Sequence, residues 1–453
     1  MSAQGFLDRP ILGWGQENYY LVFQKYFNPG LYAQEPWFDR SHNLFFDWLI
    51  HAGILGLGSF LVMVGAAFFY IFRASRDEKF PRLTGMIVGA LFLTHILQNI
   101  FVFDNLNTYI LFFAFLAYSE WVTRPYLPSG QAALGKESET GRAVGAVTNG
   151  TAGFSTALVL LLVVFLLGYF IHVKPMQESK ELIGTLQLLQ TKGVSVDQIM
   201  GAFKQTLDYH TFGDGEVREQ MANFARSVAG NSNYSVEDQK KFIAFTAEEF
   251  RKELLTPAKD VKLLLFLASI LDRSLHIDPL YGQEAEKLLL DAIQLSPTKQ
   301  ILHFELAQLY LSQGRKEDTI NVLKRVVELE PNFVQAKVNL LIVASIENRL
   351  DIVKEVIDSG INIRVLSEDG LQKIGKIYLS YQLYDKAGPV YLQLVETSPG
   401  KSEYRATLAA ILGEVGEYDH AIEEARKAAE LDSNFVKEAE TFIKIMEQKK
   451  GGR

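Results

Sequence analysis

The chain has 453 residues, a net charge of −8 and no cysteine. This length allows more than one domain, while the acidic balance argues against nucleic acid as the main partner. Without cysteine, the chain can form no disulfide, thiolate nucleophile or cysteine-ligated zinc site. The first 175 residues are rich in Phe and Leu and the remainder in Glu, Lys and Gln, which indicates a membrane part followed by a water-soluble part.

Residues 1–51 are expected to form a turn-rich loop. The stretch EPWFDRSHNLFFDWLIHAGILGLGSF places Arg40 and His42 directly before a long apolar run. We expect Asp39 or Ser41 to cap the helix that starts there, because a short oxygen-bearing side chain accepts the free backbone N–H groups. His42 would then lie in the first turn, at the positive end of the helix dipole, where phosphate groups bind readily.

These polar residues allow two interpretations. The guanidinium of Arg40 is planar and permanently charged, which suits phosphate oxygens, and histidine is the usual general base near neutral pH. Arg40 and His42 are therefore candidates for diphosphate binding and catalysis. Alternatively, both are anchors at a bilayer surface, as the aromatic side chains of Trp37, Phe38 and Trp48 would also be. Residue types alone favour the second interpretation.

Four apolar segments approach the length of about 20 residues that a membrane-spanning helix needs. They are residues 52–72, 83–103, 106–122 and 154–173. The second segment carries His95, Gln98 and Asn99 on one helical face. Because unpaired polar groups are costly in hydrocarbon, we expect this face to turn into the bundle, where hydrogen bonds between helices are favoured over substrate contact.

Basic residues predict the orientation of these spans. The first connection holds Arg73, Arg76, Lys79 and Arg82, and the linker of residues 123–153 holds three more basic residues. Since lysine and arginine accumulate on the cytoplasmic side, both connections are expected there. Residues 1–51 and everything after residue 173 are then expected outside the cytoplasm.

The pattern changes to amphipathic helices after residue 173. Residues 174–257 indicate a helical connector or degenerate repeats, whereas residues 258–450 repeat every 34 residues and end in a capping helix. Pro297 and Pro331 are one period apart, and Gly314 and Gly416 are three periods apart. A 34-residue period of paired helices is the tetratricopeptide pattern.

The sequence therefore predicts an all-α protein, with polytopic transmembrane helices followed by a tetratricopeptide-type α-solenoid. Such repeats bury their regularly spaced apolar residues against neighbouring repeats and leave a concave groove. Leu306, Tyr310 and Tyr378 are expected in the core. The groove predicts a protein partner.

The segment RPILGWGQENYY, followed by SHNLFFDWLIHAGILGLG, resembles the O-antigen ligase and polymerase family of bacterial membrane proteins. In that family a glycine-rich segment precedes a His-Asn pair, and a glycine-rich helix follows. The matching residues are Gly13, Gly15, Asn18, His42, Asn43, Gly53 and Gly56. The resemblance covers roughly residues 5–122, and some members of the family also carry C-terminal tetratricopeptide repeats.

The resemblance implies metal-independent, cofactor-free transfer of a glycan from a polyprenyl diphosphate to a lipid, glycan or protein acceptor. The reaction would take place on the outer side of the bacterial cytoplasmic (inner) membrane. His42 matches the loop histidine for which a general-base role on the acceptor is proposed, and Arg40 and Arg9 are candidates for diphosphate binding. Because such enzymes have many more spanning helices, we expect the chain to be the C-terminal part of a longer protein with little activity by itself.

Two alternatives to a ligase remain open. One is a non-catalytic membrane-anchored scaffold whose repeats bind proteins. The other is a polymerase that joins glycan units and shares the same motifs.

Overall fold

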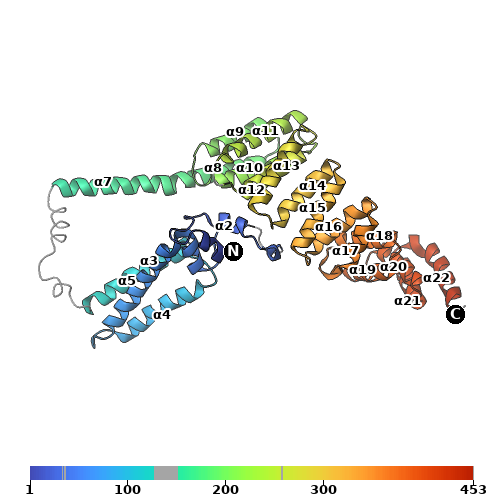
Figure 1. The fold of residues 1–453 in the computed structure, drawn as a ribbon, viewed down its shortest axis with the longest axis horizontal. Helices are drawn as coiled ribbons and strands as arrows, with labels where there is room; N and C mark the ends of the chain where they lie inside the picture. Colours follow the sequence, from blue (N-terminus) through green and yellow to red (C-terminus); the bar gives the residue numbers. More distant parts are fainter. Residues whose placement is uncertain (33, 35–36, 127–150, 257–258, 452–453) are drawn as a thin grey trace. The chain divides into compact units, whose positions relative to one another are not determined.

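The computed structural model describes the chain except residues 33, 35–36, 127–150, 257–258 and 452–453 (Figure 1). All regular elements in the described residues are helical, which confirms the predicted all-α fold. Contacts divide the chain into a first unit, Met1–Lys299, and a second unit, Gln300–Arg453.

Three apolar helices of the first unit pack against one another: α3 (Leu44–Ala74), α4 (Arg82–Gln98) and α5 (Leu106–Thr123). Their shared core includes Phe60, Phe92 and Phe112. Large apolar side chains also cover the outer surface of this bundle. The most exposed are Val62, Leu83, Met86, Phe101, Leu106 and Trp121.

Two helices in the described residues are long and apolar enough to cross a membrane, judged by length and composition. They are Leu44–Ala74 and Leu158–Leu189. The other two predicted spans correspond to α4, which has 17 residues, and to α5, which has 18, and neither meets the same criterion. Two of the four predicted spans therefore meet this criterion of length and composition.

The N-terminal loop contains α1 (Ser2–Asp8), α2 (Tyr19–Lys25) and a 3₁₀ turn at Pro29–Leu31. Its contacts reach residues far along the chain. The Gln24 amide donates to the carbonyl of Lys259 at 3.2 Å and accepts from the N–H of Val261 at 3.1 Å.

A second contact of this loop surrounds Lys299 with aromatic rings. The Lys299 ammonium lies 3.6 Å from the ring centre of Trp37, 5.0 Å from that of Phe23 and 4.9 Å from that of Phe27. All three distances are within the range of cation–π attraction. Burial lowers the pKa of Lys299 from its ordinary value of 10.5 to about 7, opposed by attraction to Asp260.

The remainder of the first unit is a series of helices. α7 (Thr151–Gly168) continues through a π-helical turn (Tyr169–Val173) into α8 (Lys174–Leu189). The five that follow are α9 (Val196–Leu207), α10 (Asp214–Val228), α11 (Val236–Glu253), α12 (Val261–Arg273) and α13 (Tyr281–Leu295). Ser195 begins α9 with a reciprocal capping box to Gln198, which fixes the start of that helix.

The second unit is a stack of helix pairs closed by a final helix. The pairs are α14 (Gln300–Ser312) with α15 (Lys316–Leu329), α16 (Val334–Ile346) with α17 (Leu350–Asp358), α18 (Glu368–Ser380) with α19 (Tyr384–Thr397), and α20 (Ser402–Glu414) with α21 (Tyr418–Leu431). The final helix α22 (Val436–Gly451) packs on α21. The expected core residues Leu306, Tyr310 and Tyr378 are buried.

The four turns inside these pairs share one geometry. Gly314, Asn348, Gln382 and Gly416 occupy the left-handed region, with φ between 53° and 84°, and each is 34 residues from the next. The residue after each one donates its N–H to the carbonyl five residues earlier at 2.8–2.9 Å. This bond is the Schellman closure of a helix C-terminus, so every pair turns in the same way.

Candidate functional site

The glycine-rich loop of the ligase-like motif docks onto a break in α3. Gly53 has φ 64° and ψ −162° inside that helix, so nearby backbone groups lack their helical partners. The carbonyl of Ile50 accepts from Trp14 N–H at 2.6 Å, the carbonyl of His51 accepts from Gly15 N–H at 3.0 Å, and Ile54 N–H donates to the carbonyl of Pro10 at 2.8 Å. The loop thus replaces the missing bonds of the helix.

Close backbone contact explains why both sides of this junction are glycine. A Cβ at Gly53 would lie 2.2 Å from the carbonyl oxygen of Ile11, and one at Gly13 would lie 2.4 Å from that of Ile50. Both glycines also have positive φ, which other residues adopt only with strain. Gly13 and Gly53 therefore have a structural role in holding the loop on α3.

Asn18 and Arg9 support the same loop through Trp14. The Asn18 amide donates to the carbonyl of Trp14 at 2.9 Å, and the Arg9 guanidinium lies over the indole ring at 4.3 Å. Arg9 is exposed. Its role in binding diphosphate remains a prediction.

Arg40 is engaged by a buried carboxylate. Its Nη2 and Nε both contact Asp47, the latter at 3.3 Å, and its Nη1 donates to the carbonyl of Asp104 at 3.4 Å. Burial opposes the charge of Arg40, but the bonds to Asp47 outweigh burial and raise the pKa of the guanidinium. A diphosphate at Arg40 would therefore have to compete with Asp47.

His42 is exposed and lies edge-on between two aromatic rings, with centroid distances of 5.1 Å to Phe38 and 5.3 Å to Phe103. The predicted caps Asp39 and Ser41 are wrong, because α3 begins after Asn43, whose side-chain oxygen accepts from Phe46 N–H at 3.0 Å. His42 consequently precedes the cap and does not lie in the first turn. An exposed imidazole remains accessible to a ligand.

The helix start is also bonded to the end of α4. The Asn43 amide donates to the carbonyl of Ile100 at 2.8 Å, and Leu44 N–H donates to the carbonyl of Asn99 at 2.8 Å. The motif residue Asn43 thus joins α3 to the segment that follows α4.

The predicted polar face of α4 divides into two parts. Asn99 donates to the carboxylate of Asp104 at 2.8 Å, and His95 lies 3.4 Å from the same oxygen. Gln98 is exposed and lies outside this cluster. Hydrogen bonding within the bundle is therefore the role that the contacts show for His95 and Asn99.

Three residues of this region were missed by the sequence interpretation: Asp47, His51 and Asp104, all buried. The His51 Nδ1 lies 3.6 Å from Asp47, as expected for an i, i+4 pair. An acidic residue at the start of a mostly apolar helix is the signal that would have singled out Asp47.

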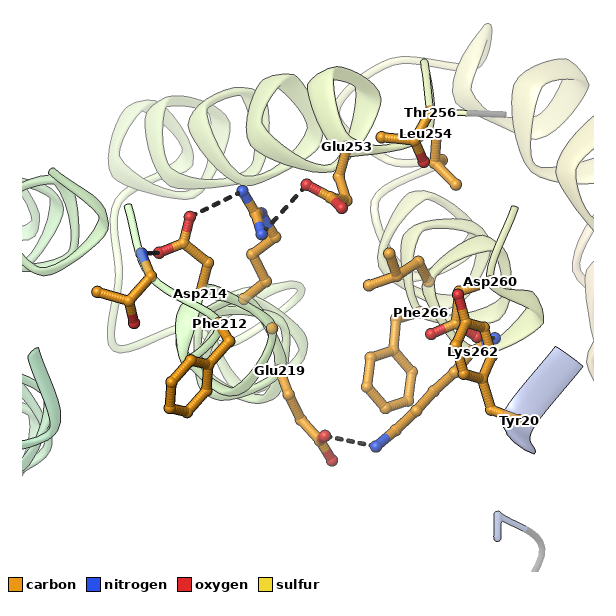
Figure 2. A pocket seen from close by; sticks show the side chains of 14 residues that line it. Tyr20, Phe212, Asp214, Glu219, Glu253, Leu254, Thr256, Asp260, Lys262 and Phe266 are labelled. Carbon is orange, nitrogen blue, oxygen red and sulfur yellow. Dashed lines mark hydrogen bonds and ion pairs between the residues drawn. The ribbon is translucent and has the colours of Figure 1, made fainter. Parts of the chain in front are cut away.

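A cavity of about 500 Å³ lies elsewhere in the first unit, between the ends of α10, α11 and α12 and Tyr20 of α2 (Figure 2). Arg218 bridges Asp214 at 3.6 Å and Glu253 at 3.3 Å, and Lys262 pairs with Glu219 at 2.5 Å. Both cations that line the cavity are thus neutralised by its own carboxylates, which leaves no cation reserved for an anionic ligand.

The second unit carries its charges in contacts between successive helix pairs. Glu368 accepts from Lys401 at 2.5 Å and from Tyr404 at 2.6 Å, and the bond from Lys401, followed by that from Tyr404, lowers the pKa of Glu368 to about 2. Arg349 pairs with Glu317 of the preceding helix pair at 2.6 Å. These bonds join successive helix pairs of the stack.

Comparison with known families explains this geometry. Residues 302–333 and 402–435 match the tetratricopeptide repeat. The second unit is built from tetratricopeptide repeats. The structure adds that the helix pairs α16–α17 and α18–α19, which lie between the matched segments, turn in the same way.

Three solved structures match part of this chain. PilF of Pseudomonas aeruginosa is 17% identical, over 52% of this chain and 99% of that chain, with a TM-score of 0.33. A tetratricopeptide repeat protein from Parabacteroides merdae is 14% identical over 51% and 98%, with a TM-score of 0.31, and MamA is 18% identical over 44% and 94%, with a TM-score of 0.22. The search of curated proteins found no match.

Proposed function

We propose that the protein is a membrane-anchored scaffold whose tetratricopeptide repeats bind a protein partner. The observation that carries this proposal is the series of four helix pairs with the same turn every 34 residues. Stacks of this kind present extended surfaces on which other chains dock. The sequence analysis treated the scaffold as an alternative to the ligase, and the repeats support it better.

Exposed apolar surface supports the membrane anchor. The large side chains from Leu158 to Leu167 are all between 42% and 69% exposed, and the most apolar stretch of Leu158–Leu189 is 6% buried. A helix in the core of a water-soluble protein would bury such a surface, because about 25 cal/mol is gained for each Å² removed from water. Lipid is the environment that this surface fits.

The absence of cysteine permits a direct test of the anchor and of its orientation. Single-cysteine variants Asp39→Cys, Lys79→Cys and Ser232→Cys place the label at exposed positions on a chain with no other thiol. We expect a membrane-impermeant maleimide to label positions 39 and 232 in intact bacterial cells and position 79 only after permeabilisation. Labelling of position 79 in intact cells would overturn the orientation, and recovery of the protein without membranes would overturn the anchor.

Photo-crosslinking tests the scaffold itself. Lys376 and Ala410 are exposed and occupy equivalent places, 34 residues apart, on α18 and α20. A photoreactive amino acid at either position of the full chain in cells should give discrete protein adducts, whereas the exposed control Glu237 on α11 should give none. Adducts at the control alone, or no adducts from the repeats, would contradict a scaffold.

Ligase-type glycan transfer is a second candidate. Two observations favour it. The motif glycines Gly13 and Gly53 lie in contact and hold the loop on α3, and His42 is exposed. The ion pair of Arg40 with Asp47 weighs against Arg40 as a diphosphate ligand. Polymerase chemistry would use the same residues.

An assay with a polyprenyl-diphosphate-linked glycan and a defined acceptor tests this second candidate. If the full chain in membranes transfers glycan, His42→Ala should abolish the reaction and Gln98→Ala, at an exposed position outside the polar cluster, should not. Equal rates for the two variants would exclude His42 as the general base.

A further inference from the structure

The second unit contains a cavity on the face formed by the second helices of its last two pairs. It measures about 710 Å³ and lies between α19 and α21, with α20 behind it. This volume falls in the range of sites that bind small molecules or peptide side chains. Leu408 and Ile411 of α20 are buried at its base, while Leu392 and Val415 are 50% and 45% exposed at its edge.

Two residues of α19 that disfavour helices open this cavity. Gly388 has no side chain to fill the space, and a Cβ there would meet nothing closer than Ile411 at 3.7 Å. Pro389 lies inside the helix and has no N–H, so it cannot donate to the carbonyl of Asp385, which also lines the cavity. A glycine and a proline inside a helix both cost stability, and no packing contact requires this glycine.

The rim of the cavity is acidic. Asp385, Glu417, Glu423 and Glu424 line it, and no lysine or arginine is among the lining residues. Glu423 and Glu424 are already paired with Lys427. The Asp385 and Glu417 carboxylates are more available, because Lys386 lies 3.9 Å from the first and the second contacts His420.

We propose that this cavity binds a peptide segment of the protein partner that carries an apolar side chain next to lysine or arginine. The apolar side chain fills the space above Gly388, and the basic group meets the carboxylates of Asp385 and Glu417. A backbone N–H of the peptide, or the basic group, donates to the Asp385 carbonyl that Pro389 leaves without its helical donor. The proposal rests on the scaffold function and adds the chemistry of the partner.

The test uses the full chain in detergent and random twelve-residue peptides displayed on phage. We expect the selected peptides to combine a Leu-sized or aromatic residue with Lys or Arg. Gly388→Leu, which fills the cavity, should weaken binding of the synthetic consensus peptide by about 10-fold or more, as should the double variant Asp385→Lys, Glu417→Lys. The matched control Gly388→Ala adds one methyl group at ordinary contact distance and should bind as the unaltered chain does.

Several outcomes would overturn the proposal. One is selection of no peptides, or of peptides without basic residues, and another is equal binding of the consensus peptide to the unaltered chain and to Gly388→Leu. A dimer of the chain that Gly388→Leu dissociates would assign the cavity to a second copy instead. Crosslinks from Lys376 and Ala410 would persist in each of these cases if the scaffold function is correct, so failure of this proposal can be told apart from failure of the function.

Discussion

The left-handed turns of the repeats allow a series of substitutions whose effects have opposite signs. Gln382 and Asn348 occupy the position that Gly314 and Gly416 occupy in the other pairs, at φ 56° and 53°. A left-handed conformation costs a residue other than glycine about 1–2 kcal/mol. Gln382→Gly should remove that cost.

The net gain is smaller than the strain because glycine also gains freedom in the unfolded chain. That term is about 0.5–1 kcal/mol, so Gln382→Gly should stabilise its helix pair by about 0.5–1 kcal/mol. Asn348→Gly should change stability by less than about 0.5 kcal/mol, since asparagine adopts this conformation routinely. Gly314→Ala should destabilise by about 1 kcal/mol, and purely through the backbone, because nothing lies within 4 Å of a Cβ at that position.

Amide hydrogen exchange of the full chain measures these differences locally. Each change should appear mainly in the exchange of its own helix pair and the adjoining one, since repeats contact only their neighbours. The side chains of Gln382 and Asn348 are exposed, so their removal takes away little packing. Faster exchange of α18 and α19 in Gln382→Gly, or unchanged exchange of α14 and α15 in Gly314→Ala, would refute the reasoning.

Three further predictions concern buried groups. The pKa of Lys299 falls from 10.5 to about 7 on folding, so the unfolded chain binds more protons between these values. The free energy of unfolding should therefore rise with pH over that range by about 5 kcal/mol. Lys299→Met should abolish this slope in urea unfolding, and a slope that persists would contradict the assignment. Gly53→Ala should detach the glycine-rich loop from α3, because it introduces strain of about 1–3 kcal/mol and breaks three hydrogen bonds of about 1 kcal/mol each. The measurement is the rate of proteolysis of the loop, which should increase. The control Gly58→Ala, with open space around its Cβ, should leave this rate unchanged. Ile374→Ala should lower the free energy of unfolding by about 2–5 kcal/mol, because it leaves a cavity in the core. The measurement is hydrogen-exchange protection of its helix pair. A loss of protection no larger than that of the exposed control Lys376→Ala would contradict this and show that the core closes around the smaller side chain.

The sequence was most informative where one short-range pattern recurred. The 34-residue spacing of prolines and glycines predicted the repeats, and Gly314 and Gly416 mark two of the four turns. The other two turns carry Asn348 and Gln382, which also occupy the left-handed region. Neither residue type requires that conformation, so only the period could have located them.

The candidate site was less predictable because its contacts join distant segments. Asp39, Ser41 and Asn43 can all cap a helix, and the sequence analysis expected Asp39 or Ser41 to do so. Asn43 caps α3, and its amide also donates to the carbonyl of Ile100, 57 residues away. Arg40 likewise donates to a distant carbonyl, that of Asp104, which lies 64 residues away in the sequence.

The π-helical turn Tyr169–Val173 marks where the proposed anchor meets the connector. The large side chains from Leu158 to Leu167 before it are exposed and apolar, whereas Pro175 and Glu178 after it are buried. Glu178 accepts from the Thr211 hydroxyl beside Gly213, where a Cβ would lie 2.9 Å from the carboxylate. No loop interrupts the helix from α7 to α8, and Glu178, five residues after the end of the π-helical turn, attaches α8 to the segment before α10. The direction in which α7 crosses a membrane would therefore set the direction of the connector helices. A continuous helix of this kind holds the connector helices at a set orientation to α7, which a flexible tether would not do.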